Sequence, residues 1–158
     1  MMMYTNDDQQ WMRQALQEAE KALDHNDVPI GAIAVRAGMV IGTGYNRREA
    51  DQDPTAHAEM IALRQAAQVL GHWRLEDVTL YCTLEPCCMC AGAMVLARLP
   101  RLVYATADPK AGCSGSVMDV LRHPLLNHSV QVEHGLFADE AAEQIRAFFR
   151  RLRAEGQK

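Results

Sequence analysis

The sequence lacks the features of a membrane-spanning, secreted or strongly basic protein. Its longest apolar-looking stretch, Val28 to Val35, has eight residues and includes Pro29 and Gly31, too short for a transmembrane helix. The N-terminus has neither the basic nor the apolar region of a signal peptide. The net charge of -4 excludes the overall basic field typical of many nucleic-acid-binding proteins. We therefore expect a cytoplasmic protein with no membrane partner.

Internal repeats, low-complexity tracts and Gly/Ser linkers are also missing. With 158 residues, 49% of them hydrophobic and 23% charged, the chain has the composition of an ordinary globular protein. That length suits one domain, which we expect to span residues 1–158.

Hydrophobic periodicity predicts helices that alternate with strands. Asp53 followed by Pro54 favours a helix start there, and Ala37-Gly38 favours a hairpin turn. This alternation is typical of a three-layer α/β domain whose sheet is mostly parallel after the opening hairpin. The expected helices cover residues 8–25, 53–70, 86–98 and 137–154, and the expected strands cover 29–36, 39–45, 78–83, 101–105 and 130–133.

Two short segments carry candidate metal ligands. His57 and Glu59 fall on the first turns of the helix expected from residue 53, and Cys87 and Cys90 on the helix expected from residue 86. The cysteines, three residues apart, share a helix face, and a helix N-terminus favours their thiolates. His57 and Glu59 are separated by about 200° around a helix. A metal beyond both helix ends would thus bind His57, Cys87 and Cys90, and Glu59 would reach only its bound water.

One imidazole and two thiolates are typical zinc ligands, and three protein ligands leave the fourth position for water, as in catalytic sites. Zinc lowers the pKa of that water to about 7, and Glu59 is the natural proton carrier. The alternative is a closed structural site with Cys88 or Cys82 as the fourth ligand. However, Cys88 projects about 100° away from Cys87 on a helix. Cys82 and Cys113 are most simply small apolar core residues.

The pattern His57-Ala-Glu59 with Pro86-Cys87-Cys-Met-Cys90 resembles the signature of zinc-dependent nucleobase deaminases. Nearly the whole chain is similar to bacterial tRNA-specific adenosine deaminases, and the segment from Asp108 to Asp119 is what narrows the resemblance to this branch. Cys88 and Cys113 depart from the family pattern, which has small or apolar residues there.

The resemblance implies a cytidine-deaminase-like α/β/α sandwich with a five-stranded mixed sheet, a homodimer, and one Zn²⁺ per subunit. It implies hydrolysis of adenosine to inosine at the wobble position of a tRNA anticodon. Zinc hydroxide would attack C6 of the flipped-out adenine, and Glu59 would shuttle the proton. The implied partner is a tRNA anticodon stem-loop, and DNA is not expected as a partner in the cell.

The resemblance also implies substrate contacts. Asn46 would hydrogen-bond the nucleoside, although an asparagine in a turn is the plainer interpretation. Asp108 would lie at the pocket mouth and accept a hydrogen bond from the ribose 2′-hydroxyl, which DNA lacks. The expected pocket walls are Pro29, Ile30, Ala58 and Leu84.

Residues 146–158 carry five basic residues and one acidic residue, a local basic surface of the kind RNA requires. The alternative is that these cations lie at the solvated C-terminal end of a helix, where they suit its dipole, and that Phe148 and Phe149 anchor the helix to the core. The candidate RNA contacts are Lys110, Phe149, Arg150 and Arg153.

Two other functions share part of this pattern. A deaminase of free guanine, cytosine or cytidine would have the zinc signature without the segment from Asp108 to Asp119 or the basic C-terminal helix. A zinc-stabilised RNA-binding module without activity would have no use for Glu59.

Overall fold

The computed structural model describes residues 3–157 and contains one five-stranded sheet, with strand order β2-β1-β3-β4-β5. β1 pairs antiparallel with both β2 and β3, whereas the pairs β3–β4 and β4–β5 are parallel. The predicted five-stranded mixed sheet and opening hairpin are therefore confirmed. The strands are β1 (Gly31–Arg36), β2 (Met39–Tyr45), β3 (Thr79–Leu84), β4 (Arg101–Thr106) and β5 (Gln131–His134).

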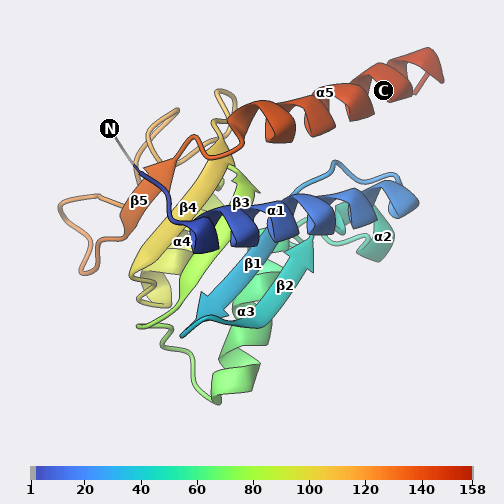
Figure 1. Cartoon of the computed structure of the whole chain (residues 1–158). Helices are drawn as coiled ribbons and strands as arrows, with labels where there is room; N and C mark the ends of the chain where they lie inside the picture. The colour runs from blue at the N-terminus through green and yellow to red at the C-terminus, as the bar shows by residue number, and fades with distance from the viewer. Residues whose placement is uncertain (1–2, 158) are drawn as a thin grey trace.

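Helices cover both faces of the sheet (Figure 1). On one face α1 and α5 pack over Ile33 and Val35, and on the other α3 and α4 pack over Ala32 and Ala34. This alternation along β1 creates two apolar cores and confirms the predicted α/β/α sandwich. The helical segments are α1 (Asn6–Glu20), the 3-10 helix η1 (Lys21–His25), α2 (Arg48–Asp51), α3 (Ala58–Leu70), α4 (Cys88–Leu96) and α5 (Ala138–Ala154).

A glycine lets the first turn of α3 lie close to the sheet. A Cβ at Gly44 would lie 2.2 Å from the carbonyl oxygen of Ala58, closer than real Cβ contacts allow. β2 and α3 therefore meet backbone to backbone beside the segment that carries His57 and Glu59.

The predicted start of this helix at Asp53 was wrong, because α3 begins at Ala58. The Asp53 carboxylate accepts hydrogen bonds from the Thr55 N–H and hydroxyl, both 2.8 Å. It thus forms a local turn instead of capping a helix. His57 is consequently the N-cap of α3, outside the helix, whereas Glu59 is its second residue.

Among the helices of residues 3–157, none has both the length and the apolar character that a membrane span requires.

A buried carboxylate ties α1 to the sheet. Asp8, which is 4% exposed, accepts hydrogen bonds from the Tyr81 hydroxyl at 2.7 Å and from Arg101 Nη1 at 3.0 Å. Burial alone would raise the pKa of Asp8, but the hydrogen bonds from Arg101, Tyr81 and Thr5 outweigh it and lower the pKa to about 2.

Asp8→Asn is expected to destabilise the protein in a pH-dependent way. A depressed folded-state pKa stabilises the protein above the unfolded-state pKa near 4, and this contribution disappears as pH falls towards 2. Urea unfolding should show a loss of about 2 kcal/mol at pH 7 and a smaller difference from wild type at pH 3. The exposed neighbour Asp7 provides the control, Asp7→Asn. Equal stability of Asp8→Asn and wild type at pH 7 would contradict the assignment.

Candidate active site

Two helix N-termini meet at the predicted metal ligands. His57 is the N-cap of α3, Cys87 is the N-cap of α4, and Cys90 lies in the first turn of α4. The Nδ1 atom of His57 lies 3.6 Å from Cys87 Sγ and 3.5 Å from Cys90 Sγ. Both helix dipoles direct their positive ends here, which favours anionic thiolates.

These donor atoms fit a zinc ion. The ligand atoms of His57, Cys87 and Cys90 all lie within 4.8 Å of one another. Zinc–sulfur and zinc–nitrogen bonds of about 2.3 and 2.0 Å at a tetrahedral angle put the two ligand atoms about 3.5 Å apart, in agreement with the separations above. Cys88 is exposed and Cys82 is fully buried, and neither joins this group among residues 3–157. The described residues thus supply three ligands, as an open catalytic site requires.

A hydrogen bond between the Cys87 and Cys90 side chains shifts the pKa values of both thiols. The hydrogen bond from the Cys90 thiol, followed by that from His57, lowers the pKa of Cys87 to about 3. The same hydrogen bond to Cys87, together with burial, raises the pKa of Cys90. A divalent cation bound by these residues would hold both sulfurs as thiolates.

Glu59 lies beside the metal-binding group and outside it. Its side chain is 4% exposed, and burial raises the pKa of the carboxyl group, an effect that His57 partly opposes. Burial thus favours the protonated form of this carboxyl group, which is the form that donates a proton. Glu59 therefore has the environment of a general acid/base.

The site opens into a cavity of about 690 Å³, a size suited to a small molecule or one nucleotide. Of the residues that the sequence placed in the pocket walls, Ile30, Ala58 and Leu84 line it, whereas Pro29 does not. Pro29 is buried, and its neighbour Val28, which was not predicted, lines the cavity with Ile30.

Asn46 and Asp108 both line the cavity, and each is also part of a turn. Asn46, which is 3% exposed, donates to the Val28 carbonyl at 3.2 Å and accepts from the Arg48 N–H at 3.2 Å. Asp108 Oδ1 accepts from the N–H groups of Lys110 and Ala111. Each side chain retains unused hydrogen-bonding capacity, so the turn role and a substrate role are compatible.

The C-terminal helix contributes one wall of the cavity. Ile145, Arg146 and Phe149 of α5 line it, as does Lys110. Phe149 is 42% exposed, whereas Phe148 is buried and anchors the helix. Of these α5 residues, Phe149 was a predicted RNA contact, Arg146 was counted only as part of the basic segment 146–158, and Ile145 was not predicted. The helical period could have indicated the other two, because Ile145 and Arg146 precede Phe149 by four and three residues.

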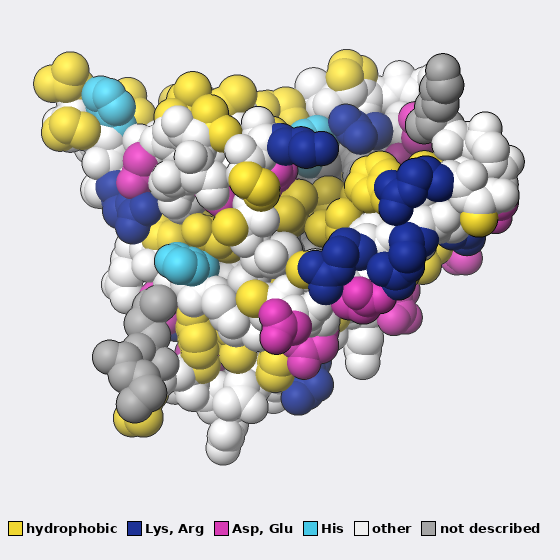
Figure 2. Space-filling model, turned by 90° about the horizontal axis from the view of Figure 1, so that it is seen from above, with side chains coloured by type: hydrophobic (Ala, Val, Ile, Leu, Met, Phe, Trp, Pro, Cys, Tyr) yellow, Lys and Arg dark blue, Asp and Glu magenta, His cyan; other side chains and the backbone are white. Residues whose placement is uncertain are grey.

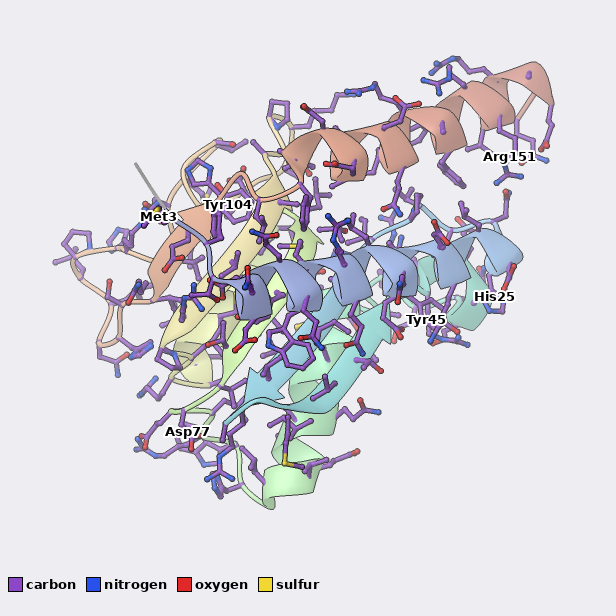
Figure 3. The ribbon with its side chains drawn as sticks, viewed as in Figure 1. Met3, His25, Tyr45, Asp77, Tyr104 and Arg151 are labelled. Carbon is purple, nitrogen blue, oxygen red and sulfur yellow. The ribbon has the colours of Figure 1, made fainter. Side chains whose placement is uncertain are left out.

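Other basic residues of α5 lie outside the cavity. Arg150 and Arg153 do not line it, and Arg150 pairs with Glu143. Arg151 donates to Asn26 at 3.1 Å, beside the end of η1 where His25 lies (Figure 3). Lys and Arg side chains gather over the C-terminal end of α5 when the molecule is seen from above (Figure 2).

Fold and site together define a metal-dependent deaminase: a five-stranded α/β/α sandwich with three metal ligands beside a buried glutamate. Residues 6–153 match the family model described as MafB19-like deaminase.

Individual proteins with high sequence identity to this chain identify the family within this class. A tRNA-specific adenosine deaminase of Bacillus subtilis (strain 168) is 47% identical over 92% of this chain and 91% of that protein. One of Streptococcus pyogenes serotype M18 (strain MGAS8232) is 44% identical over 96% of each. A structure from work on A-to-I editing by tRNA:A34 deaminases at the wobble position is 43% identical. It has a TM-score of 0.82 and covers 85% of this chain and 98% of that one. The chain belongs to the tRNA-specific adenosine deaminase family.

Proposed function

We propose that this chain, acting as one zinc-dependent deaminase domain, hydrolyses adenosine to inosine at the wobble position of a tRNA anticodon. One observation carries the proposal: the three candidate metal ligands and buried Glu59 line or adjoin a cavity that Asp108, Lys110 and Phe149 also line. Relatives over most of the chain are tRNA-specific adenosine deaminases. We place the reaction in the cytoplasm with a tRNA anticodon stem-loop as partner.

The reaction replaces the C6 amino group of adenine by oxygen from water and releases ammonia. Zinc held by His57, Cys87 and Cys90 would lower the pKa of water and so supply a nucleophile at neutral pH. Glu59 takes a proton from the attacking water, passes it to N1 of the ring, and assists departure of the amino group as ammonia. Asn46 holds the nucleoside from the cavity wall.

The direct test is incubation of the purified protein with an anticodon stem-loop that carries adenosine at the wobble position. Inosine detected by mass spectrometry is the expected product, and a stem-loop with guanosine there serves as control. Ammonia released from free guanine, cytosine or cytidine, with an unchanged stem-loop, would instead establish a free-base or nucleoside deaminase.

We also propose a homodimer, as the family resemblance implies. Large apolar side chains that a second copy could cover are exposed at Leu96, Val117, Met118 and Leu125. Light scattering at micromolar concentration should give the mass of two chains, and the mass of one chain would contradict the proposal.

Asn46→Ala is expected to reduce kcat/KM on the stem-loop by about tenfold, chiefly through KM, because hydrogen bonds to the nucleoside are lost. Zinc content should stay at the wild-type level, since Asn46 is not a ligand. Asn46→Asp keeps the acceptor for the Arg48 N–H but loses the donor to the Val28 carbonyl, so comparison with Asn46→Ala isolates the contribution of the bond from Arg48. Unchanged kinetics of Asn46→Ala would leave Asn46 with the turn role alone.

A further inference from the structure

Glu85 is a buried carboxylate that the chemistry of deamination does not use. It is 2% exposed and lies between β3 and α4, two residues before the ligand Cys87. Its backbone N–H donates to the Thr106 carbonyl at 2.9 Å, so the main chain of Glu85 is fixed to the end of β4.

The carboxylate accepts four hydrogen bonds, all from one segment, residues 108–116. Oε1 accepts from the Asp108 N–H at 3.0 Å and from the Ser116 hydroxyl. Oε2 accepts from the Ser114 N–H at 2.9 Å and from the Ser116 N–H at 3.1 Å. A carboxylate buried in a protein normally requires several hydrogen bonds of this kind to offset the loss of its hydration.

The segment encloses the carboxylate so tightly that it needs a glycine. A Cβ at Gly112 would lie 2.3 to 2.5 Å from Glu85 Cδ, Oε1 and Oε2. Both ends of the segment and its middle are therefore placed by the position of one side chain.

The first four residues of this segment line the cavity, and we call them its rim. They are Asp108, Pro109, Lys110 and Ala111, and the two charged residues are those expected to contact RNA. The rim is thus attached, through Glu85, to the stretch of chain that leads into Cys87.

We propose that Glu85 is a positioning residue that holds Asp108 and Lys110 at the cavity mouth and thereby sets the preference for RNA over DNA. This inference rests on the proposed function. Glu85 acts through the rim, since Asp108 would contact the ribose 2′-hydroxyl that DNA lacks.

Glu85→Gln tests the inference with a nearly isosteric side chain. The amide oxygen can still accept from the Ser114 and Ser116 N–H groups. The amide nitrogen then takes the place of Oε1, where the Ser116 hydroxyl can turn to accept from it but the Asp108 N–H cannot. The variant therefore disrupts the bond to the backbone of Asp108 while preserving the remaining contacts.

The measurement is kcat and KM on matched RNA and DNA stem-loops with the target adenosine, together with zinc content. Glu85→Gln should lower kcat/KM on RNA about tenfold, mostly through KM, and reduce the RNA-to-DNA ratio by a similar factor. Its zinc content should equal wild type. The matched control is Glu20→Gln, at an exposed glutamate distant in sequence from the rim.

Variants at Gly112 test the same inference by changing the segment that encloses the carboxylate. Gly112→Ala should also lower the RNA-to-DNA ratio, because its methyl group displaces the carboxylate. In the Glu85→Ala background, Gly112→Ala should have much less effect, since the obstructing group is gone. If Glu85→Gln fails to fold, Ser116→Ala, which removes one of the four bonds, should give a smaller shift in the same direction.

An unchanged RNA-to-DNA ratio in folded Glu85→Gln, or in Ser116→Ala if Glu85→Gln does not fold, would overturn the inference and leave the proposed function intact. Additive effects of Glu85→Ala and Gly112→Ala would also overturn it. A wild-type protein that produced no inosine from the RNA stem-loop would refute the proposed function instead.

Discussion

Glu59→Ala should retain one zinc ion per chain and lose roughly 10²- to 10⁴-fold in turnover, the usual contribution of a general acid/base. The carboxyl group is buried beside the metal ligands without belonging to them, so its removal leaves His57, Cys87 and Cys90 in place. Single-turnover inosine formation and zinc analysis on the same sample measure the two effects separately.

Glu59→Gln is the matched control that keeps the shape of the Glu59 side chain. It preserves the volume and burial of the side chain but cannot transfer a proton, so it should be about as inactive as Glu59→Ala. Since burial raises the pKa of Glu59, the charged form is disfavoured there, and neither variant should lower the urea midpoint much. Turnover at the wild-type rate in either variant would refute the proton-carrier role.

The predicted metal ligands did not depend on accurate helix boundaries. The sequence predicts that His57 lies within a helix that starts at residue 53, whereas His57 is the N-cap of α3 in the structure. The three ligands nevertheless converge, because both segments come directly before or at a helix start and both helices pack on one sheet face. Residue type and spacing were sufficient to predict a group of three side chains that could hold a metal ion.

Contacts between distant segments were not predictable from local pattern. The helix α2 depends on the carboxylate of Asp27, which accepts from the N–H groups of Glu49 and Ala50 at 2.7 and 3.1 Å. Those partners are 22 and 23 residues away along the chain. The wall that α5 contributes to the cavity and the contacts of Glu85 with the rim are long-range in the same way. Hydrophobic periodicity and turn residues indicate only contacts between residues that are near in sequence, so they could not predict these long-range features.

Cys87→Ala should lose nearly all of the bound zinc and the stability that zinc provides. Two ligands remain, and the helix N-terminus that favours the Cys87 thiolate no longer has a sulfur to stabilise. Metal binding to the folded state alone stabilises a protein, by about 4 kcal/mol at a thousandfold excess over the dissociation constant. The variant should therefore unfold in urea like chelator-treated wild type, and added chelator should not change it further.

Cys88→Ala is the matched control for this experiment, because it removes the adjacent thiol, which is exposed and lies outside the metal-binding group. Its zinc content and unfolding midpoint should equal wild type, and chelator should destabilise it as it does wild type. If Cys87→Ala kept full zinc, another residue would have to supply the third ligand, and the assignment of Cys87 would be wrong. If Cys87→Ala lost zinc but stayed as stable as zinc-loaded wild type, the metal would serve catalysis without supporting the fold. Retention of zinc would thus refute the ligand set, whereas loss of zinc without loss of stability would refute only the link between metal and stability.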